Sequence, residues 1–266
     1  MQIKNLTKKY RNNSVLNNIT VDFSKETTLI IGKNGSGKTT LFKILGGIIK
    51  NYNGKIEETD NVSLLLDIDS LFMLKTGMEN LEYFLSSEEL LNATLLIQYF
   101  EINSYVSNIV KTYSSGMKKK LMLVIAFSRN KDVILLDEPT NSLDAYSVDL
   151  LKKYLKKIKG KKKVLIASHD ISIFDKQLID EIYMLKNGNL VTKNVALYDY
   201  TIFKIITKDK IVGKYSPVKT TLTASYFKIS NGDIEAFSKY ISKFIILHMS
   251  PITYLDELYL MEVYNE

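Results

Sequence analysis

A glycine-rich stretch, Gly32-Lys33-Asn34-Gly35-Ser36-Gly37-Lys38-Thr39, directly follows the aliphatic run Thr28–Ile31. It matches the phosphate-binding loop pattern G-x-x-x-x-G-K-[ST], whose glycines let backbone N–H groups curl around nucleotide phosphates. The aliphatic run has the length of a buried strand, and the spacing of apolar residues predicts a helix that begins near Lys38. The strand, loop and helix together predict an α/β sheet that binds a nucleotide at the carboxyl ends of its strands.

The residue types in this loop indicate separate roles. Lys38 is expected to neutralise the β- and γ-phosphate oxygens, and the Thr39 hydroxyl is placed to ligate Mg²⁺. The helix N-terminus contributes the positive end of its dipole. The residues expected to contact the nucleotide are Asn34, Gly35, Ser36, Gly37, Lys38, Thr39 and Thr40.

Two adjacent acids provide the second chemical signal. Asp137 and Glu138 follow Val133–Leu136, a four-residue aliphatic strand of the kind that is buried on both faces of a parallel sheet. Since ligands bind outside the carboxyl ends of such strands, both side chains should emerge beside the phosphates. We predict that Asp137 holds the Mg²⁺ water shell and that Glu138 polarises the attacking water. Without the phosphate loop, two acids at this position would suit a helix cap.

Composition excludes several other classes of protein. The 266 residues are 45% hydrophobic and 24% charged, as in an ordinary globular protein, and they include no cysteine, so disulfides and thiolate zinc sites are excluded. We find no run of about 18 uncharged apolar residues and no signal peptide, so the chain is expected to be neither membrane-spanning nor secreted. The net charge of +7 is almost wholly lysine. Because base reading favours arginine, no nucleic-acid partner is expected.

The chain divides into two parts by pattern. Strand and helix signals alternate up to about residue 192, with a glycine-free helical stretch from Met78 to Asn108. Residues 193–266 then form a small α+β domain. Its expected elements are strands at Thr201–Ile206, Leu222–Ile229 and Ile245–Met249, a helix at Asp233–Phe244 and a terminal helix at Thr253–Val263. The lysine cluster Lys152–Lys163 suits a solvated helix end, or contact with acidic lipid.

From Met1 to about Thr192, these motifs resemble, in order and spacing, the nucleotide-binding subunit of ATP-binding cassette (ABC) transporters. The resemblance implies an α/β fold with a P-loop NTPase (RecA-like) core. It also implies an N-terminal antiparallel β subdomain, a helical insert at about residues 70–130 and a C-terminal α+β appendage. ATP and Mg²⁺ are the ligands that it implies.

The resemblance extends to single residues around the nucleotide. Tyr10 looks like the aromatic residue on which the family stacks adenine. His169, which follows the strand Val164–Ala167, lies where the family has its switch histidine. That histidine is expected to bind γ-phosphate and to act in catalysis with Glu138 and Lys38.

A second group of residues resembles the parts that act across a dimer. The segment Tyr113–Met117 occupies the place of the family signature, usually written LSGGQ. Ser114 and Gly116 are therefore expected to contact the nucleotide of a second subunit, so that two chains enclose two ATP molecules. Asn141–Asp144 matches a loop that passes close to the partner's site in the family.

Three positions depart from the family pattern. Asp67 stands where the family has a glutamine, and its shorter carboxylate can ligate Mg²⁺. Ser115 replaces a glycine of the signature, and Met117 replaces a polar residue. Ser115 adds a Cβ where the backbone approaches phosphate, so the rate of hydrolysis does not follow from the resemblance.

The resemblance implies an ATPase at the cytoplasmic face of the membrane, bound to a separate membrane-spanning permease that docks on the insert between Asp67 and Lys111. Leu255–Tyr259 is similar to the terminal stretch of some bacterial exporter subunits, which favours export, with a peptide or lipid-like cargo as a guess. Two alternatives stay open. One is a soluble ATPase that acts on nucleic acid, and the other is a nucleotide-binding regulatory scaffold without turnover.

Overall fold

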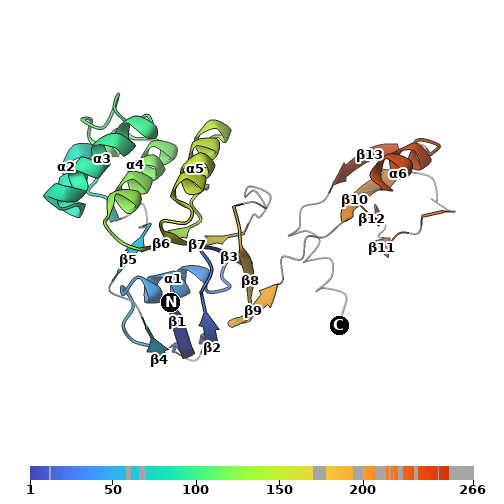
Figure 1. The fold of residues 1–266 in the computed structure, drawn as a ribbon, viewed down its shortest axis with the longest axis horizontal. Helices are drawn as coiled ribbons and strands as arrows, with labels where there is room; N and C mark the ends of the chain where they lie inside the picture. Colours follow the sequence, from blue (N-terminus) through green and yellow to red (C-terminus); the bar gives the residue numbers. More distant parts are fainter. Residues whose placement is uncertain are drawn as a thin grey trace. The chain divides into compact units, whose positions relative to one another are not determined.

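The structure is a computed structural model. It describes residues 1–11, 13–57, 61–65, 70–169, 178–193, 200–207, 214–215, 217, 219–220, 224–230, 233–244 and 246–251. The chain separates into two compact units, Met1–Asn194 and Val195–Glu266 (Figure 1). The elements of the first unit are β1 (Gln2–Tyr10), β2 (Asn13–Asp22), β3 (Thr27–Ile31), α1 (Lys38–Leu45), β4 (Asn53–Ile56), β5 (Val62–Leu64), α2 (Gly77–Phe84), α3 (Ser87–Tyr99), the 3-10 turn η2 (Val110–Thr112), α4 (Ser115–Ser128), β6 (Val133–Asp137), α5 (Ala145–Ile158), β7 (Lys163–Ser168), β8 (Glu181–Lys186) and β9 (Asn189–Lys193).

A six-stranded sheet in the order β5-β6-β7-β3-β8-β9 forms the centre of this unit. β5, β6, β7, β3 and β8 pair in parallel, and β9 pairs antiparallel with β8. The turn between β8 and β9 has Asn187 at φ 49° and Gly188 at φ 77°, the left-handed pair of a tight hairpin. Because β3, β6 and β7 are adjacent and parallel, their carboxyl ends meet at one edge of the sheet.

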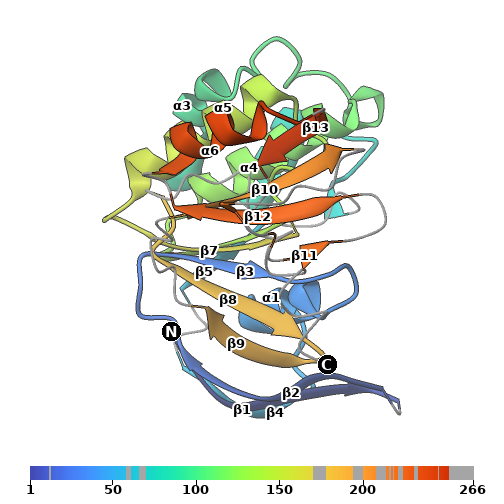
Figure 2. The same ribbon diagram turned by 90° about the vertical axis from the view of Figure 1, so that its right-hand side faces the viewer.

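Helix α1 lies between the central sheet and a smaller antiparallel sheet in the order β2-β1-β4, as Figures 1 and 2 show from two directions. Its apolar residues Leu41, Phe42, Ile44 and Leu45 are fully buried in one core. That core also contains Ile3, Leu6, Leu16 and Ile19 from the small sheet and Ile30, Leu135 and Leu165 from the central one. Apolar residues on both sides of α1 thus fix the phosphate loop that precedes it.

The inserted stretch is helical, as the sequence predicts, but it is divided. α2 ends at Phe84, Leu85 is extended at φ −122°, and Ser86 caps the N-terminus of α3. Both helices begin with a capping box, formed by Thr76 with Glu79 and by Ser86 with Glu89. The break is decided by Ser86, whose hydroxyl accepts the orphan N–H of Glu89 and so favours a new helix start. With α4, these helices form a helical subdomain.

The second unit contains β10 (Tyr200–Thr207), β11 (Lys219–Thr220), β12 (Ser225–Ser230), α6 (Ile234–Ile241) and β13 (Ile246–Pro251). Its sheet has the order β11-β12-β10-β13. Phe203, Phe227 and Phe237 are buried together in its core, with the Phe237 ring 5.4 to 5.6 Å from the other two. The predicted helix Thr253–Val263 lies outside the described residues. Among the helices of the described part of the chain, none is long and apolar enough to cross a bilayer.

Candidate functional site

The phosphate loop connects β3 to α1 through two glycines that tolerate no side chain. At Gly32 an added Cβ would lie 2.6 Å from the Leu185 carbonyl oxygen, so β8 closes the space behind the loop. Gly37 has φ 105° and its added Cβ would lie 3.1 Å from Val15 of β2. That φ lies in the region that residues with a Cβ rarely adopt. The loop is therefore held between both sheets, with its amides at the N-terminus of α1.

Lys38 extends back over the loop. Its side chain is 6% exposed, and its amine donates to the carbonyl of Gly32 at 2.7 Å and to that of Lys33 at 3.3 Å. The same nitrogen lies 3.5 Å from Glu138 Oε1. A buried amine needs such partners because desolvation of a charge is costly. The amine is thus fixed at the edge of the sheet, at the position expected for a phosphate ligand.

Glu138 lies between Lys38 and His169. Its backbone is in the left-handed region at φ 44°, and its N–H donates to Ala167 O at 2.8 Å, so β7 holds it just past β6. Oε2 lies 2.9 Å from His169 Nδ1 and 3.4 Å from both Ser168 Oγ and the His169 backbone nitrogen. An ionised carboxylate only accepts, so Nδ1 carries the proton of this bond and Nε2 is the acceptor of the neutral ring.

The residues around Lys38 fit a magnesium-bound nucleotide. Ser36 Oγ is buried and has no hydrogen-bond partner among the described residues, which is the state expected of a donor aimed at a ligand. The Thr39 side chain lies at the start of α1, and Asp137 ends β6 opposite Ala167 of β7. A hydroxyl and a carboxylate are oxygen ligands, as Mg²⁺ prefers. Asp67, the third predicted ligand, lies outside the described residues.

Tyr10 lies at the end of β1, on the hairpin whose second strand packs against the phosphate loop. It pairs with Asn13, at the start of the strand whose Val15 packs against Gly37. The ring is 46% exposed, and Lys8 Nζ lies 4.6 Å from its centroid. An exposed aromatic face is suited to stacking on a base.

Ser114 and Gly116 lie on the helical subdomain, at the N-terminus of α4. Ser114 caps the helix, since its Oγ accepts the Met117 N–H at 3.2 Å. An added Cβ at Gly116 would lie 2.7 Å from Ser142 O, so the first turn of α4 packs directly on the loop before α5. That loop ends at Asp144, whose hydrogen bonds to Ser147 lower its pKa.

Two contacts of this site were missed from the sequence. Ser168 lies 3.4 Å from the Glu138 carboxylate, and its position next to His169 at the end of a predicted strand was the available signal. Val15 supports the phosphate loop from the small sheet. Packing between segments far apart in the chain leaves no local pattern, so no sequence signal indicated Val15.

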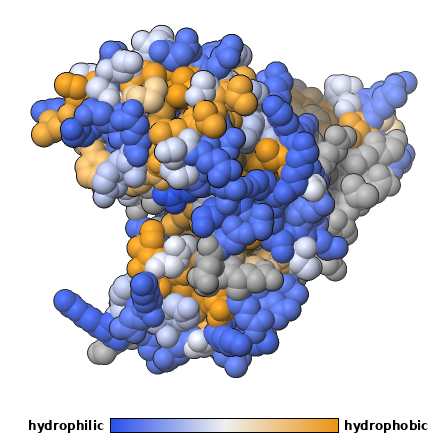
Figure 3. Space-filling view, turned by 60° about the vertical axis from the view of Figure 1, so that its left-hand side comes forward, coloured by the Kyte–Doolittle hydropathy of each residue, from blue (hydrophilic) through white to orange (hydrophobic). Residues whose placement is uncertain are grey.

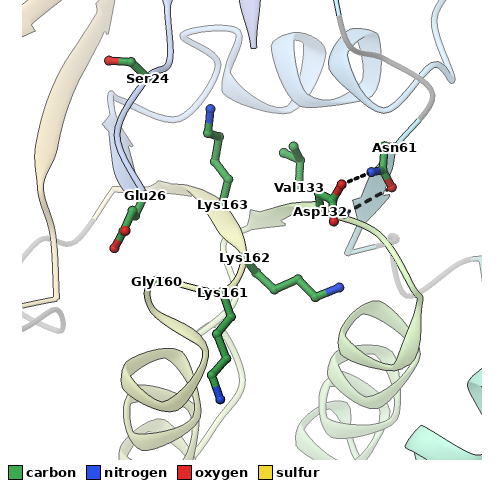
Figure 4. Close-up of a pocket in the computed structure, with 9 residues that line it drawn as sticks. All are labelled: Ser24, Glu26, Asn61, Asp132, Val133, Gly160, Lys161, Lys162 and Lys163. Atoms are coloured by element: carbon green, nitrogen blue, oxygen red, sulfur yellow. Dashed lines mark hydrogen bonds between the residues drawn. The ribbon is translucent and has the colours of Figure 1, made fainter.

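A pocket of about 460 Å³ opens at the other edge of the central sheet, at the amino ends of β6 and β7. Lys161, Lys162 and Lys163 line it, but Figure 4 shows their side chains pointing in different directions. The amines of Lys162 and Lys163 donate to the backbone carbonyls of Lys131 and Phe23. The lysines therefore do not converge on a shared anion, and the predicted site lies at the opposite edge of the sheet.

The helical subdomain exposes a group of apolar side chains (Figure 3). Phe72 packs against Tyr83, with ring centroids 4.4 Å apart, and both are largely exposed. Leu74 is 78% exposed and Ile109 48%. We call Phe72, Leu74, Tyr83 and Ile109 the apolar surface. Rimmed apolar patches of this kind mark sites of protein contact.

Comparison with known proteins gives consistent matches. The family model described as ABC transporter matches residues 16–141. The chain is 31% identical over 214 residues to the polysialic acid transport ATP-binding protein KpsT of Escherichia coli, covering 75% of this chain and 98% of KpsT. It is also 31% identical over 182 residues to the zinc import ATP-binding protein ZnuC of a Wolbachia species, covering 65% of this chain and 74% of ZnuC.

Among solved structures, the dimeric structure of MJ0796, a bacterial ABC transporter cassette, is similar with a TM-score of 0.63. The two chains are 24% identical, and the match covers 71% of this chain and 95% of the other. At this identity the likeness concerns the fold.

Proposed function

The chain belongs to the ABC transporter ATP-binding protein family, and from this premise we propose that two copies enclose MgATP and drive export by a separate membrane-spanning partner. As a member of the family it is an ATPase that uses ATP with Mg²⁺, which agrees with the fold. The observation that carries the proposal is the cluster of Lys38, Glu138 and His169 at the carboxyl ends of three adjacent parallel strands.

We assign the chemistry at this cluster to three side chains. Lys38 exchanges its bonds with backbone carbonyls for the β- and γ-phosphate oxygens, where its charge offsets theirs. Glu138 orients the attacking water and accepts its proton as the water oxygen bonds to the γ-phosphorus and the bond from that phosphorus to the bridging oxygen of ADP breaks. His169 is held by Glu138 through Nδ1, which leaves Nε2 on the far side of the ring, where we assign it to γ-phosphate and the attacking water.

We assign Thr39 and Asp137 as the side chains that would hold Mg²⁺, which would supply positive charge to offset that of the phosphates. Tyr10 is assigned to the adenine ring, because its exposed face lies on the hairpin that packs against the phosphate loop. Asn34, Gly35, Ser36, Gly37 and Thr40 complete the set assigned to the nucleotide.

We assign Ser114 and Gly116 to the nucleotide held by the second copy. Both lie at the N-terminus of a 14-residue helix, where the Ser114 hydroxyl and the first backbone N–H groups suit an anion. Arginine is scarce, with Arg11 and Arg129 the two in the sequence, so a second helix N-terminus is a suitable source of positive potential for γ-phosphate. Enclosure between two copies would bring the two halves of the site together.

The apolar surface is the proposed docking site of the membrane-spanning partner. It lies within the insert between Asp67 and Lys111, and its exposed aromatic side chains are of the type that is enriched at the buried centre of interfaces. Attachment through this surface would place the chain on the membrane as a peripheral subunit.

The proposal that the transporter exports its cargo rests on a different observation from the assignment of ATPase activity. The C-terminal unit Val195–Glu266 follows the cassette, and the sequence resembles exporter subunits that carry a small domain there. The matched relatives are named for polysialic acid transport and for zinc import, so their names do not favour one direction. A peptide or lipid-like cargo is proposed with export.

Steady-state phosphate release tests the proposal. The wild-type chain should hydrolyse MgATP, and Glu138→Gln should reduce the rate by about 10²-fold or more while ATP still binds. Equal, near-zero rates for both would instead identify a nucleotide-binding scaffold. Leu74→Glu should leave the rate of the isolated chain unchanged and prevent its recovery with membranes that contain the partner, which separates docking from catalysis.

A further inference from the structure

Tyr113, the residue before Ser114, buries a hydroxyl group at a position of the motif that does not require one. It is 4% exposed, and its ring lies edge-on to that of Tyr105 at 5.0 Å and 85°. The family signature written LSGGQ has leucine at this position. Leucine could fill the same space, but only tyrosine brings a hydroxyl, which must find a partner because it is buried.

The hydroxyl of Tyr113 has such a partner. It donates to the backbone carbonyl of Tyr105 at 2.6 Å, and an added Cβ at Gly77 would lie 2.5 Å from the same hydroxyl oxygen. Burial raises the pKa of Tyr113, which keeps the hydroxyl protonated and able to donate. The position is therefore filled by a hydrogen-bonded side chain rather than by an apolar one.

The hydrogen bond ties the signature to the start of α2. The carbonyl of Tyr105 also accepts the Asn108 N–H at 2.8 Å, and in the same loop the carbonyl of Val106 accepts the Met78 N–H at 2.8 Å. Met78 belongs to the first turn of α2. The loop 105–108 accepts hydrogen bonds from backbone N–H groups at the N-terminus of α2. Tyr113 thus connects this loop with Ser114.

A second connection joins the same segment to the apolar surface. The Val110 N–H donates to Lys75 O at 2.8 Å, and the Lys111 N–H donates to Met73 O at 2.8 Å. These two bonds pair the backbone of residues 110–111 with that of the residues on either side of Leu74. The Leu74 side chain is exposed to solvent. The signature is therefore linked on one side to α2 and on the other to the proposed docking site.

We propose that Tyr113 is a positioning residue, whose hydroxyl holds Ser114 in the position from which it contacts the nucleotide of the second copy. This inference rests on the proposed enclosure of ATP between two copies. Ser114 itself is exposed and is fixed through its own helix cap and through the chain on its N-terminal side. Removal of the Tyr113 hydroxyl would loosen that anchor without touching the phosphate loop.

The test compares hydroxyl deletions in the Glu138→Gln chain, which is expected to hold ATP without turnover. With MgATP, Tyr113→Phe should raise the dimer dissociation constant measured by sedimentation about 2- to 10-fold, the value of one hydrogen bond. The affinity of the monomer for MgATP should stay the same. Tyr105→Phe is the matched control, because the Tyr105 hydroxyl is buried with no partner among the described residues and its removal should leave dimerisation unchanged.

A double-mutant cycle separates positioning from a merely structural role. If Tyr113 acts through Ser114, Tyr113→Phe should have no further effect on dimerisation once Ser114→Ala is present, whereas independent effects would add and would overturn the inference. Should Tyr113→Phe fail to fold, Tyr113→Leu supplies the same hydroxyl deletion. Unchanged dimerisation in Tyr113→Phe overturns this inference alone. A Glu138→Gln parent that never dimerises overturns the proposed function with it.

Discussion

Glu138 and His169 are joined by a hydrogen bond of 2.9 Å between the carboxylate Oε2 and the ring Nδ1. The bond connects the residue after β6 with the residue after β7, so it exists only because the two strands are adjacent and parallel. It fixes the imidazole tautomer and leaves the other carboxylate oxygen beside Lys38. The arrangement places a base, an acceptor and a cation at one edge of the sheet.

The first prediction concerns this pair. His169→Ala should lower kcat for ATP hydrolysis about 10²- to 10³-fold, as loss of a group that stabilises charge in the transition state does, while the affinity for ATP changes little. Phosphate release and nucleotide titration measure the two quantities. His248→Ala is the matched control, since the other histidine lies on β13 of the second unit. A large loss of affinity with an unchanged kcat would contradict the assignment.

The second prediction concerns Tyr10. Tyr10→Ala should weaken ATP binding by about 1–3 kcal/mol, or roughly 5- to 150-fold, because a base loses its stacking surface. Tyr10→Phe keeps the ring and should bind ATP almost as the wild type does. Fluorescence titration with a labelled nucleotide can measure both. Equal losses in the two variants would show that the hydroxyl, not the ring face, matters.

Backbone geometry gives the third prediction. Gly37 and Gly160 both have positive φ, at 105° and 80°, so alanine at either position should cost about 1–2 kcal/mol of folding free energy. Only Gly37→Ala should also lose ATP binding, because Gly37 lies in the phosphate loop and Gly160 follows α5. Denaturant unfolding and calorimetric titration measure the two effects. Retained ATP binding by Gly37→Ala would contradict the role assigned to the loop.

The fourth prediction concerns pH. The hydrogen bond from Lys75, with those from Thr76, lowers the pKa of Glu79 from its ordinary value of 4.5 to about 2. A depressed pKa means that the capping box stabilises α2 fully above about pH 4.5 and that this contribution is lost as the pH falls toward 2. NMR titration of the Glu79 carboxyl should show the depressed value. In Lys75→Ala that value should rise, and an unchanged value would show that Lys75 is not the cause of the shift.

The sequence predicted the central architecture well, because local signals agree there. The aliphatic runs before Gly32 and Asp137 have the length and composition of buried strands, and the structure places both in one parallel sheet. The helix that begins at Lys38 follows from a clear start signal. The proximity of Lys38 and Glu138 followed from the rule about the carboxyl ends of parallel strands, and the expectation that His169 joins them came from the resemblance.

The remaining features of the fold and the site depend on contacts between segments, which no local sequence pattern indicates. The sequence did not indicate that Gly116 packs on Ser142, or that Tyr113 donates to Tyr105, since each pair joins residues brought together only by folding. The end of α2 at Phe84 was missed because Ser86 fits within a longer helical pattern. The roles assigned to Asp67 and to Leu255–Tyr259 stay predictions, because those residues lie outside the described part of the chain.

The most direct test of the central claim is sedimentation of the Glu138→Gln chain with and without MgATP. We predict a monomer without nucleotide and a dimer with MgATP, and Lys38→Ala in the same background should abolish the shift. A chain that binds MgATP tightly in calorimetry yet sediments as a monomer at every concentration would contradict the claim that two copies enclose the nucleotide.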